Sequence, residues 1–199
     1  MSRQKISKAI SALIKGEIIV YPTDTIYGLG ADIFNEEAVE KIFKIKKRPK
    51  DQPISIAVSS IDDLKKIAVL NDAALKIAEK FLPGKITLIL KKKEIISDTL
   101  LSGTDSIGVR IPNNKTALEI LKNFGPMTCT SANIHKQPTP TVISEINMLF
   151  KQSGIEVYLD EGPLENKPST IIDLTSGQYK IIRYGDITKE MIRDAINNG

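Results

Sequence analysis

The order of helix and strand patterns along the chain constrains its fold most. In the first half, apolar residues at helical spacing alternate with short β-branched runs, which favours parallel pairing between strands. Near the C-terminus, residues 170–174 and 179–184 flank the turn sequence 175–178, which is typical of an antiparallel hairpin. The chain therefore predicts an α/β fold with a twisted, mixed parallel and antiparallel sheet flanked by helices.

The expected elements follow from this periodicity and from capping residues such as Asn35, Ser60 and Thr188. Strands are expected at 17–21, 53–58, 85–91, 106–111, 127–131 and 155–159, besides the hairpin. Helices are expected at 6–14, 35–48, 71–81 and 115–123. A short helix is expected after residue 60, and two further helices are expected to begin after residue 141 and at residue 188.

Length and composition limit the class of protein. A chain of 199 residues suffices for one substantial core, so we interpret 1–199 as a single domain. Apolar residues make up 41% of the chain, yet no run approaches the ~20 apolar residues that span a bilayer, and residues 1–5 lack a signal core. We therefore expect a cytoplasmic protein. Single copies of cysteine (Cys129) and histidine (His135) exclude an internal disulfide and leave zinc without a ligand set.

Three short polar residues follow the first expected strand. Thr23, Asp24 and Thr25 come directly after Pro22, and Gly28 lets the chain pass close to a neighbour. An ordinary polar turn is one interpretation, and a ligand-binding turn is the other. The basic residues that follow favour the second.

Residues 41–50 contain six basic side chains and no acidic one. Lysines near a helix C-terminus complement its dipole, which explains most of this run. Lys46 and Arg48 differ, because Pro49 ends the helix there and turns the chain toward the next strand. A planar guanidinium beside a mobile ammonium suits a triphosphate.

Arg110 lies in an expected strand whose apolar residues take the opposite face, so its side chain needs an anion. A protein carboxylate in a structural salt bridge and a ligand carboxylate are both consistent with the sequence. The polar residues Ser131 and Asn133 follow another strand, where open α/β sheets commonly bind ligands. Cys129 has no nearby basic residue in the sequence, so we interpret it as a small buried side chain rather than a nucleophile. No strand precedes a G-x-G-x-x-G or G-x-x-x-x-G-K-[ST] loop, so phosphate would be bound in another way.

Seven ordered segments share the pattern of one known family. They are 22–30 (PTDTIYGLG), 46–49 (KKRP), 82–87 (LPGKIT), 108–112 (GVRIP), 130–133 (TSAN), 169–171 (STI) and 183–185 (RYG). Through them the chain resembles the YrdC/TsaC family of threonylcarbamoyl-AMP synthases, in its stand-alone form and over nearly its whole length.

The resemblance implies a nucleotidyltransferase that makes threonylcarbamoyl-AMP and pyrophosphate from L-threonine, bicarbonate or CO2, and ATP. Mg²⁺ would arrive with ATP, without a protein metal site. The product would pass to a threonylcarbamoyl transferase that modifies tRNA, and direct tRNA binding is a further expectation.

The resemblance also implies residue roles. The catalytic residues would be Lys46, Arg48, Ser131 and Asn133. ATP would be held by Arg48, Gln52, Ser106, Ser131, Thr139 and Arg183, and threonine by Thr25, Arg110, Cys129 through its backbone, and Ser169. Three places depart from the family pattern: Ala57 replaces a histidine of longer members, Gln52 an asparagine, and His135-Lys136 a Ser-Gly pair.

Two other functions are consistent with parts of the sequence. A non-catalytic module of the same fold could bind double-stranded RNA or tRNA through phosphates, as the net charge of +4 permits. Aromatic residues make up 5% of the chain, which argues against stacking on single strands. An enzyme acting on a sugar phosphate ranks last, because no acidic cluster accompanies the single histidine.

Overall fold

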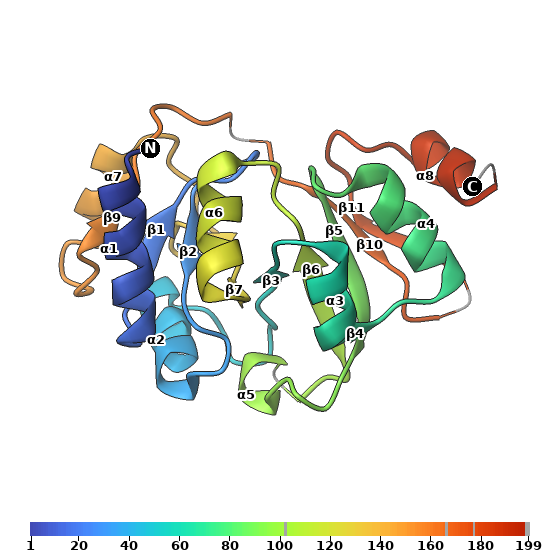
Figure 1. Cartoon of the computed structure of the whole chain (residues 1–199), viewed down its shortest axis with the longest axis horizontal. Helices are drawn as coiled ribbons and strands as arrows, with labels where there is room; N and C mark the ends of the chain where they lie inside the picture. Colours follow the sequence, from blue (N-terminus) through green and yellow to red (C-terminus); the bar gives the residue numbers. More distant parts are fainter. Residues whose placement is uncertain (102, 166, 177, 198–199) are drawn as a thin grey trace.

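The strands form two sheets rather than one, and the two lie side by side in the computed structural model (Figure 1). The structure describes residues 1–101, 103–165, 167–176 and 178–197. The first sheet has the order β8-β2-β1-β9, and the second has the order β11-β10-β5-β6-β3-β7 with β4 paired to β5. The first contains β1 (Ile19–Tyr21), β2 (Gly28–Gly30), β8 (Thr130–Ser131) and β9 (Val157–Tyr158). The second contains β3 (Ile56–Ala57), β4 (Ala68–Val69), β5 (Ile86–Lys92), β6 (Ser106–Arg110), β7 (Met127–Thr128), β10 (Thr170–Asp173) and β11 (Lys180–Arg183).

Both sheets are mixed, as the sequence predicts. Strand β1 pairs antiparallel with β2 and parallel with β9, while β10 pairs parallel with β5 and antiparallel with β11. The β10–β11 pair is the predicted hairpin, although Gly177 in its turn lies outside the described residues. The expected strand at 53–58 is reduced to β3, because only Ile56 and Ala57 pair with the strands on either side.

Residues 127–131 join the two sheets. The sequence predicts one strand here, but β7 pairs with β3 of the second sheet and β8 pairs with β2 of the first. The break falls at Cys129, whose amide donates to Ser55 O at 2.7 Å. The Thr128 hydroxyl accepts from Ala31 N and donates to Leu29 O, so it ties the crossing point to β2 and the residue after it.

Helices cover the sheets (Figure 1), and the predicted caps Asn35, Ser60 and Thr188 each directly precede one. Asn35, Asn71 and Asn114 each accept a hydrogen bond from a first-turn amide, which satisfies a donor that the helix itself leaves unpaired. The helices are α1 (Arg3–Ile14), α2 (Glu36–Lys46), α3 (Ile61–Ile67), α4 (Asp72–Phe81), α5 (Asp98–Leu101), α6 (Lys115–Phe124), α7 (Ile143–Leu149) and α8 (Lys189–Asn197). Helix α2 ends at Lys46, two residues earlier than Pro49 predicts, because Lys47 adopts a left-handed conformation with φ of 50°.

Two apolar clusters hold these layers together. The smaller packs α1 and α6 against β1 through residues such as Leu13, Ile19 and Leu121, whereas the larger extends across both sheets. Ile14, which the sequence assigns to the apolar stripe of α1, is 72% exposed because it lies on the solvent side of that helix's last turn. The shared cluster fixes the two sheets relative to each other.

Gly185, the second residue after β11, should tolerate no side chain. An added Cβ would meet Pro168 O and Thr170 N at 2.6 Å, both backbone atoms that cannot move aside easily. We expect Gly185→Ala to lower the free energy of unfolding in urea by more than Gly154→Ala does. At Gly154 only the φ of 75° opposes a side chain, at a cost of about 1 kcal/mol. Equal losses in the two variants would contradict this account.

Candidate functional site

A cavity of about 360 Å³ opens between the two sheets, where the crossing segment 127–131 brings them together. Its walls come from the turn after β1, the segment before β3, strands β5 and β6, and residues around the β10–β11 pair. Most of the predicted site residues lie on its surface. They are Thr25, Arg48, Arg110, Cys129, Ser131, Asn133, Thr139, Ser169 and Arg183.

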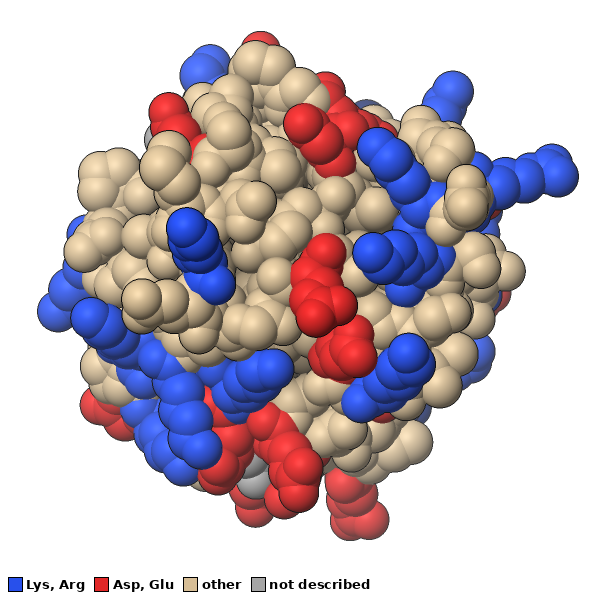
Figure 2. All heavy atoms as spheres, turned by 90° about the vertical axis from the view of Figure 1, so that its left-hand side faces the viewer, with Lys and Arg blue, Asp and Glu red and all other residues tan. Residues whose placement is uncertain are grey.

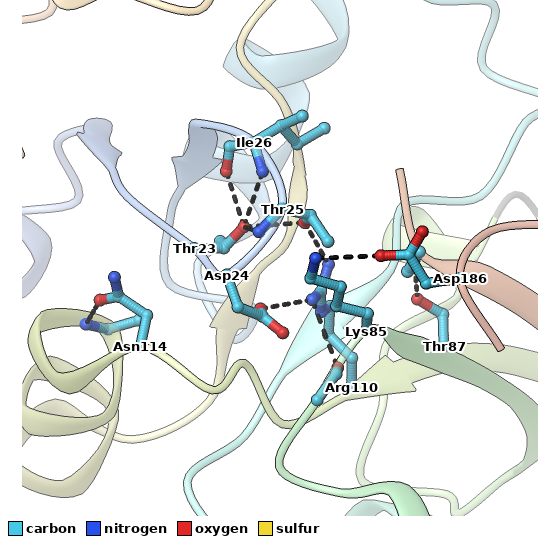
Figure 3. Close-up of polar contacts among 12 residues, drawn as sticks. Thr23, Asp24, Thr25, Ile26, Lys85, Thr87, Arg110, Asn114 and Asp186 are labelled. Atoms are coloured by element: carbon cyan, nitrogen blue, oxygen red, sulfur yellow. Dashed lines mark hydrogen bonds and ion pairs between the residues drawn. The ribbon is translucent and has the colours of Figure 1, made fainter. Parts of the chain in front are cut away.

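The turn after β1 is fixed by its own threonines. The Thr23 hydroxyl accepts from the amides of Thr25 and Ile26, both at 3.2 Å, and donates to Ile26 O at 2.6 Å (Figure 3). Such side-chain bonds to nearby backbone are what make short polar residues good turn formers. The Thr25 side chain is thereby held against the cavity.

Arg110 forms the structural salt bridge that is one of the two interpretations of its sequence context. Its Nη2 lies 2.6 Å from Asp24 Oδ1, its Nη1 donates to Thr25 Oγ1 at 3.0 Å, and it also lines the cavity (Figure 3). The Arg110 and Asp24 side chains are only 6% and 9% exposed. Arg110 Nε and Asp24 Oδ2 are buried without a hydrogen-bond partner in the described part of the chain. The Arg110–Asp24 contact is therefore a structural salt bridge, formed by a residue that also lines the cavity.

Arg183 and Thr87 hold Ser169 from two directions. Arg183 donates to Ser169 O from Nε at 3.0 Å and from Nη2 at 2.8 Å. The Thr87 and Ser169 hydroxyl oxygens are 2.8 Å apart. Burial and, secondarily, the charge of Arg110 lower the pKa of Arg183, which indicates that cationic charge gathers here.

Lys46 lies beneath the cavity and does not line it. Its side chain is almost wholly buried, and Nζ donates to Ser131 O, to Asn133 O at 2.9 Å and to Asn133 Oδ1 at 3.0 Å. The Ser131 hydroxyl also donates to Asn133 Oδ1, at 2.6 Å. Lys46 therefore shapes the loop that presents Ser131 and Asn133. Burial, followed by the charge of Arg48, lowers the pKa of Lys46 to about 7.

Arg48 reaches the cavity from the other side of the α2 terminus. Its Nε and Nη2 donate to Gln52 O at 3.0 Å and Pro53 O at 2.9 Å. Gln52 thus orients Arg48 through its backbone, and its side chain is not part of the cavity wall. Ser106 lies outside the wall as well, at the far end of β6, four residues or ~13 Å along the strand from Arg110.

The residues that depart from the family pattern lie close to the site. Ala57 is buried and lies opposite Arg110 in the β3–β6 pair. His135 lies in a loop, is half-buried, and its amide donates to Lys46 O at 2.8 Å. Burial and the nearby charges of Arg48, Lys136 and Lys46 lower the pKa of His135. Cys129 is only partly buried and lines the cavity, so the predicted buried side chain is wrong, because the chain passes from one sheet to the other at this residue. Desolvation nevertheless raises the pKa of its thiol.

Sequence reasoning assigned no role to three polar residues at the site: Asp24, Ser55 and Thr87. From the sequence, Asp24 is interpreted only as a polar turn residue, although it is the one acidic residue in segment 22–30. Ser55 and Thr87 lie in the cavity wall, and Thr87 belongs to the quoted segment 82–87. Their hydroxyls carry no periodic signal that distinguishes them from ordinary strand residues.

The described residues contain no group of three or more His, Cys, Asp or Glu side chains placed to hold a metal ion. No helix among them is long and apolar enough to cross a membrane.

A model of the Sua5/YciO/YrdC family, described as "Telomere recombination", matches residues 11–185. This match covers most of the chain, and the cavity lies within it. The chain belongs to the Sua5/YciO/YrdC family.

Individual relatives agree with this assignment. A putative threonylcarbamoyl-AMP synthase of Methanocaldococcus jannaschii is 40% identical, over 88% of this chain and 83% of the relative. The structure of Pyrococcus abyssi Sua5 complexed with L-threonine superposes with a TM-score of 0.92 at 33% identity, covering 99% of this chain and 58% of that one. Escherichia coli YciO superposes with a TM-score of 0.87 at 29% identity, covering 93% and 91%. The chain thus corresponds to part of the Pyrococcus protein and to nearly all of YciO.

The depressed pKa of Lys46 predicts a pH dependence of stability. In the unfolded chain Lys46 keeps its proton up to a pKa near 10.5, whereas the folded protein loses it near 7. Between these values the unfolded state binds more protons, so the free energy of unfolding should rise with pH. We expect urea denaturation to show wild type gaining stability relative to Lys46→Met between about pH 7 and 9. The subtraction removes other titrating groups, and parallel pH curves for the two proteins would contradict the prediction.

Proposed function

We propose that this protein is a threonylcarbamoyl-AMP synthase, a nucleotidyltransferase that uses L-threonine, bicarbonate or CO2, and ATP. One observation carries the proposal: three guanidinium groups, of Arg48, Arg110 and Arg183, line one cavity together with serine and threonine hydroxyls. Such a set suits an amino-acid carboxylate beside a triphosphate. Relatives that carry this activity in their names match most of the chain.

The reaction needs no covalent intermediate on the protein. The threonine amine adds to CO2 and loses a proton to give a carbamate, and a carbamate oxygen attacks the α-phosphorus of ATP while pyrophosphate leaves. A displacement of this kind depends on positioning and on neutralising charge at the phosphates. The cations and hydroxyls of the cavity supply both. Mg²⁺ belongs to the substrate MgATP, held mainly by phosphate oxygens.

On the threonine side, Arg110 receives the carboxylate, with Thr25 and Ser169 beside it and the backbone at Cys129 closing the wall. Arg110 has five N–H hydrogens. Its contacts to Thr25, Asp24 and Gly84 O use three of these, which leaves Nε–H and one Nη1 hydrogen. These two hydrogens lie on different sides of the guanidinium, so a carboxylate would accept from one of them and be attracted by the arginine charge.

On the nucleotide side, Arg48, Ser131, Thr139 and Arg183 contact ATP, and Lys46 and Asn133 keep the 131–133 loop in place. Support comes from the hydrogen bonds of Arg48 and Arg183, which go to backbone carbonyls and leave their charge for phosphates. Gln52 acts through its carbonyl on Arg48. Ser106 lies outside the cavity wall, so we assign it no contact.

Downstream, the product passes to a threonylcarbamoyl transferase for tRNA modification, and direct tRNA binding stays a prediction. The basic run on α2 gives limited support to an RNA-binding role, because Glu40 pairs with Lys50 at 3.1 Å and Lys44 at 3.9 Å. On the face shown in Figure 2, basic and acidic side chains are interspersed. Catalysis therefore remains the favoured function over a non-catalytic RNA-binding module.

Purified protein should release pyrophosphate from MgATP only when L-threonine and bicarbonate are both present. The physical reason is that the attacking group is the carbamate formed from these two. A coupled pyrophosphate assay, with each component omitted in turn, measures this. Equal release without threonine would refute the proposed substrate. Tight tRNA binding without adenylate formation from any amino acid would favour the RNA-binding module.

Two arginine variants should separate the halves of the site. Arg110→Lys keeps a charge beside Asp24 but loses the fork, so the KM for threonine should rise about tenfold or more while the KM for ATP changes little. Arg48→Ala should chiefly impair ATP use, by about 100-fold in kcat/KM. Arg193→Ala, on exposed α8, is the matched control and should retain wild-type kinetics. Loss of ATP use alone in Arg110→Lys would show the assignment to be reversed.

A further inference from the structure

We propose that Thr87 is a positioning residue that makes the Ser169 hydroxyl a fixed hydrogen-bond donor toward the carboxylate of the amino-acid substrate. The inference rests on the proposed function and adds to it a residue to which the sequence assigned no role. Thr87 touches no reacting atom, so its effect passes through Ser169.

Strand register places Thr87 between the two sides of the amino-acid site. In the parallel β5–β10 pair, Thr87 lies opposite Ile171, two residues after Ser169. In the antiparallel β5–β6 pair, Leu88 lies opposite Val109, which puts Thr87 level with Arg110. Figure 3 shows Thr87 and Asp24 on opposite sides of Arg110. Thr87 is 4% exposed and lines the cavity.

The partners available to each hydroxyl determine which one donates in the Thr87–Ser169 hydrogen bond. Either hydroxyl could donate across the 2.8 Å separation. Within the described part of the chain, the Thr87 hydroxyl has Ser169 as its hydrogen-bond partner and no other. If Ser169 donated to Thr87, its single hydrogen would be used, whereas a carboxylate bound at Ser169 needs that hydrogen because a carboxylate can only accept. Thr87 therefore donates.

Ser169 then has its acceptor sites filled. A serine hydroxyl has two lone pairs and one hydrogen. One lone pair receives Thr87, and the other receives Arg183 Nη2 at 3.3 Å, where arginine can only donate. The remaining hydrogen is free for a ligand in the cavity, which Ser169 lines. Ser169 consequently offers the substrate a donor, as a carboxylate oxygen requires.

The backbone at Ser169 is held independently of Thr87. Arg183 clamps Ser169 O with two hydrogen bonds, and Gly185 packs against the peptide that follows Ser169. Thr87 therefore acts on the Ser169 hydroxyl alone and restricts its rotation. A donor fixed in advance costs no reorientation when substrate binds.

Three variants test this proposal in the full-length protein. Thr87→Val keeps the shape of the side chain and removes its hydroxyl, while Thr87→Ser keeps the hydroxyl and removes the methyl group. Thr116→Val removes another buried threonine hydroxyl, one that donates to Glu161 and lies outside the cavity wall. The readouts are kcat, the KM for L-threonine and for ATP, the calorimetric Kd of L-threonine, and Tm.

For Thr87→Val we expect the KM and Kd for L-threonine to rise about five- to tenfold, with kcat and the KM for ATP within about twofold of wild type. Thr87→Ser should restore wild-type values, and Thr116→Val should change Tm alone. Unchanged threonine affinity in Thr87→Val, or equal losses in Thr87→Val and Thr87→Ser, would overturn the proposal while leaving the synthase function intact. Wild-type protein that neither binds nor uses L-threonine would refute the proposed function itself, and the role of Thr87 with it.

Discussion

The buried ion pair between Asp24 and Arg110 is the interaction on which the site depends. Asp24 follows β1 of the first sheet and Arg110 ends β6 of the second, so the 2.6 Å contact joins the sheets at the cavity. Removing either partner would leave a charge buried without compensation, which is far more costly than losing a surface pair. The same contact orients the guanidinium toward Thr25. The relative position of the sheets and the direction of Arg110 are therefore set together.

The other cations of the site are held differently, and the difference explains the charge of the cavity. Arg48, Arg183 and Lys46 donate to backbone carbonyls of residues such as Pro53, Ser169 and Asn133. A carbonyl fixes the direction of a cation without neutralising it, whereas a carboxylate does both. Of the three arginines that line the cavity, only Arg110 pairs with a carboxylate of the described residues. The wall keeps an excess of positive charge, as a triphosphate site requires.

The sequence predicts local features well and non-local pairing poorly. Asn35, Ser60 and Asn71 are confirmed as helix caps, because capping depends on residues three positions apart. The predicted α/β class, mixed pairing and family are confirmed as well, whereas the extent of a single domain over 1–199 stays a prediction. The division into two sheets could not be predicted, since the partner of each strand lies far along the chain. The switch at Cys129, from β3 to β2, leaves no mark in a pattern of alternating residues.

Lys46 and Arg48 belong to one sequence motif, 46–49 (KKRP), but a single backbone angle between them sends their side chains in different directions. Lys46 is the last residue of α2, and Lys47 follows with φ of 50°, in a region where a residue with a Cβ costs roughly 1–2 kcal/mol. This reversal lets the Arg48 amide donate to Phe43 O and turns the chain out of the helical path. Lys46 consequently points inward to the carbonyls of Ser131 and Asn133, while Arg48 reaches the cavity. Lys46 shapes the loop and Arg48 lines the cavity because a single left-handed residue lies between them.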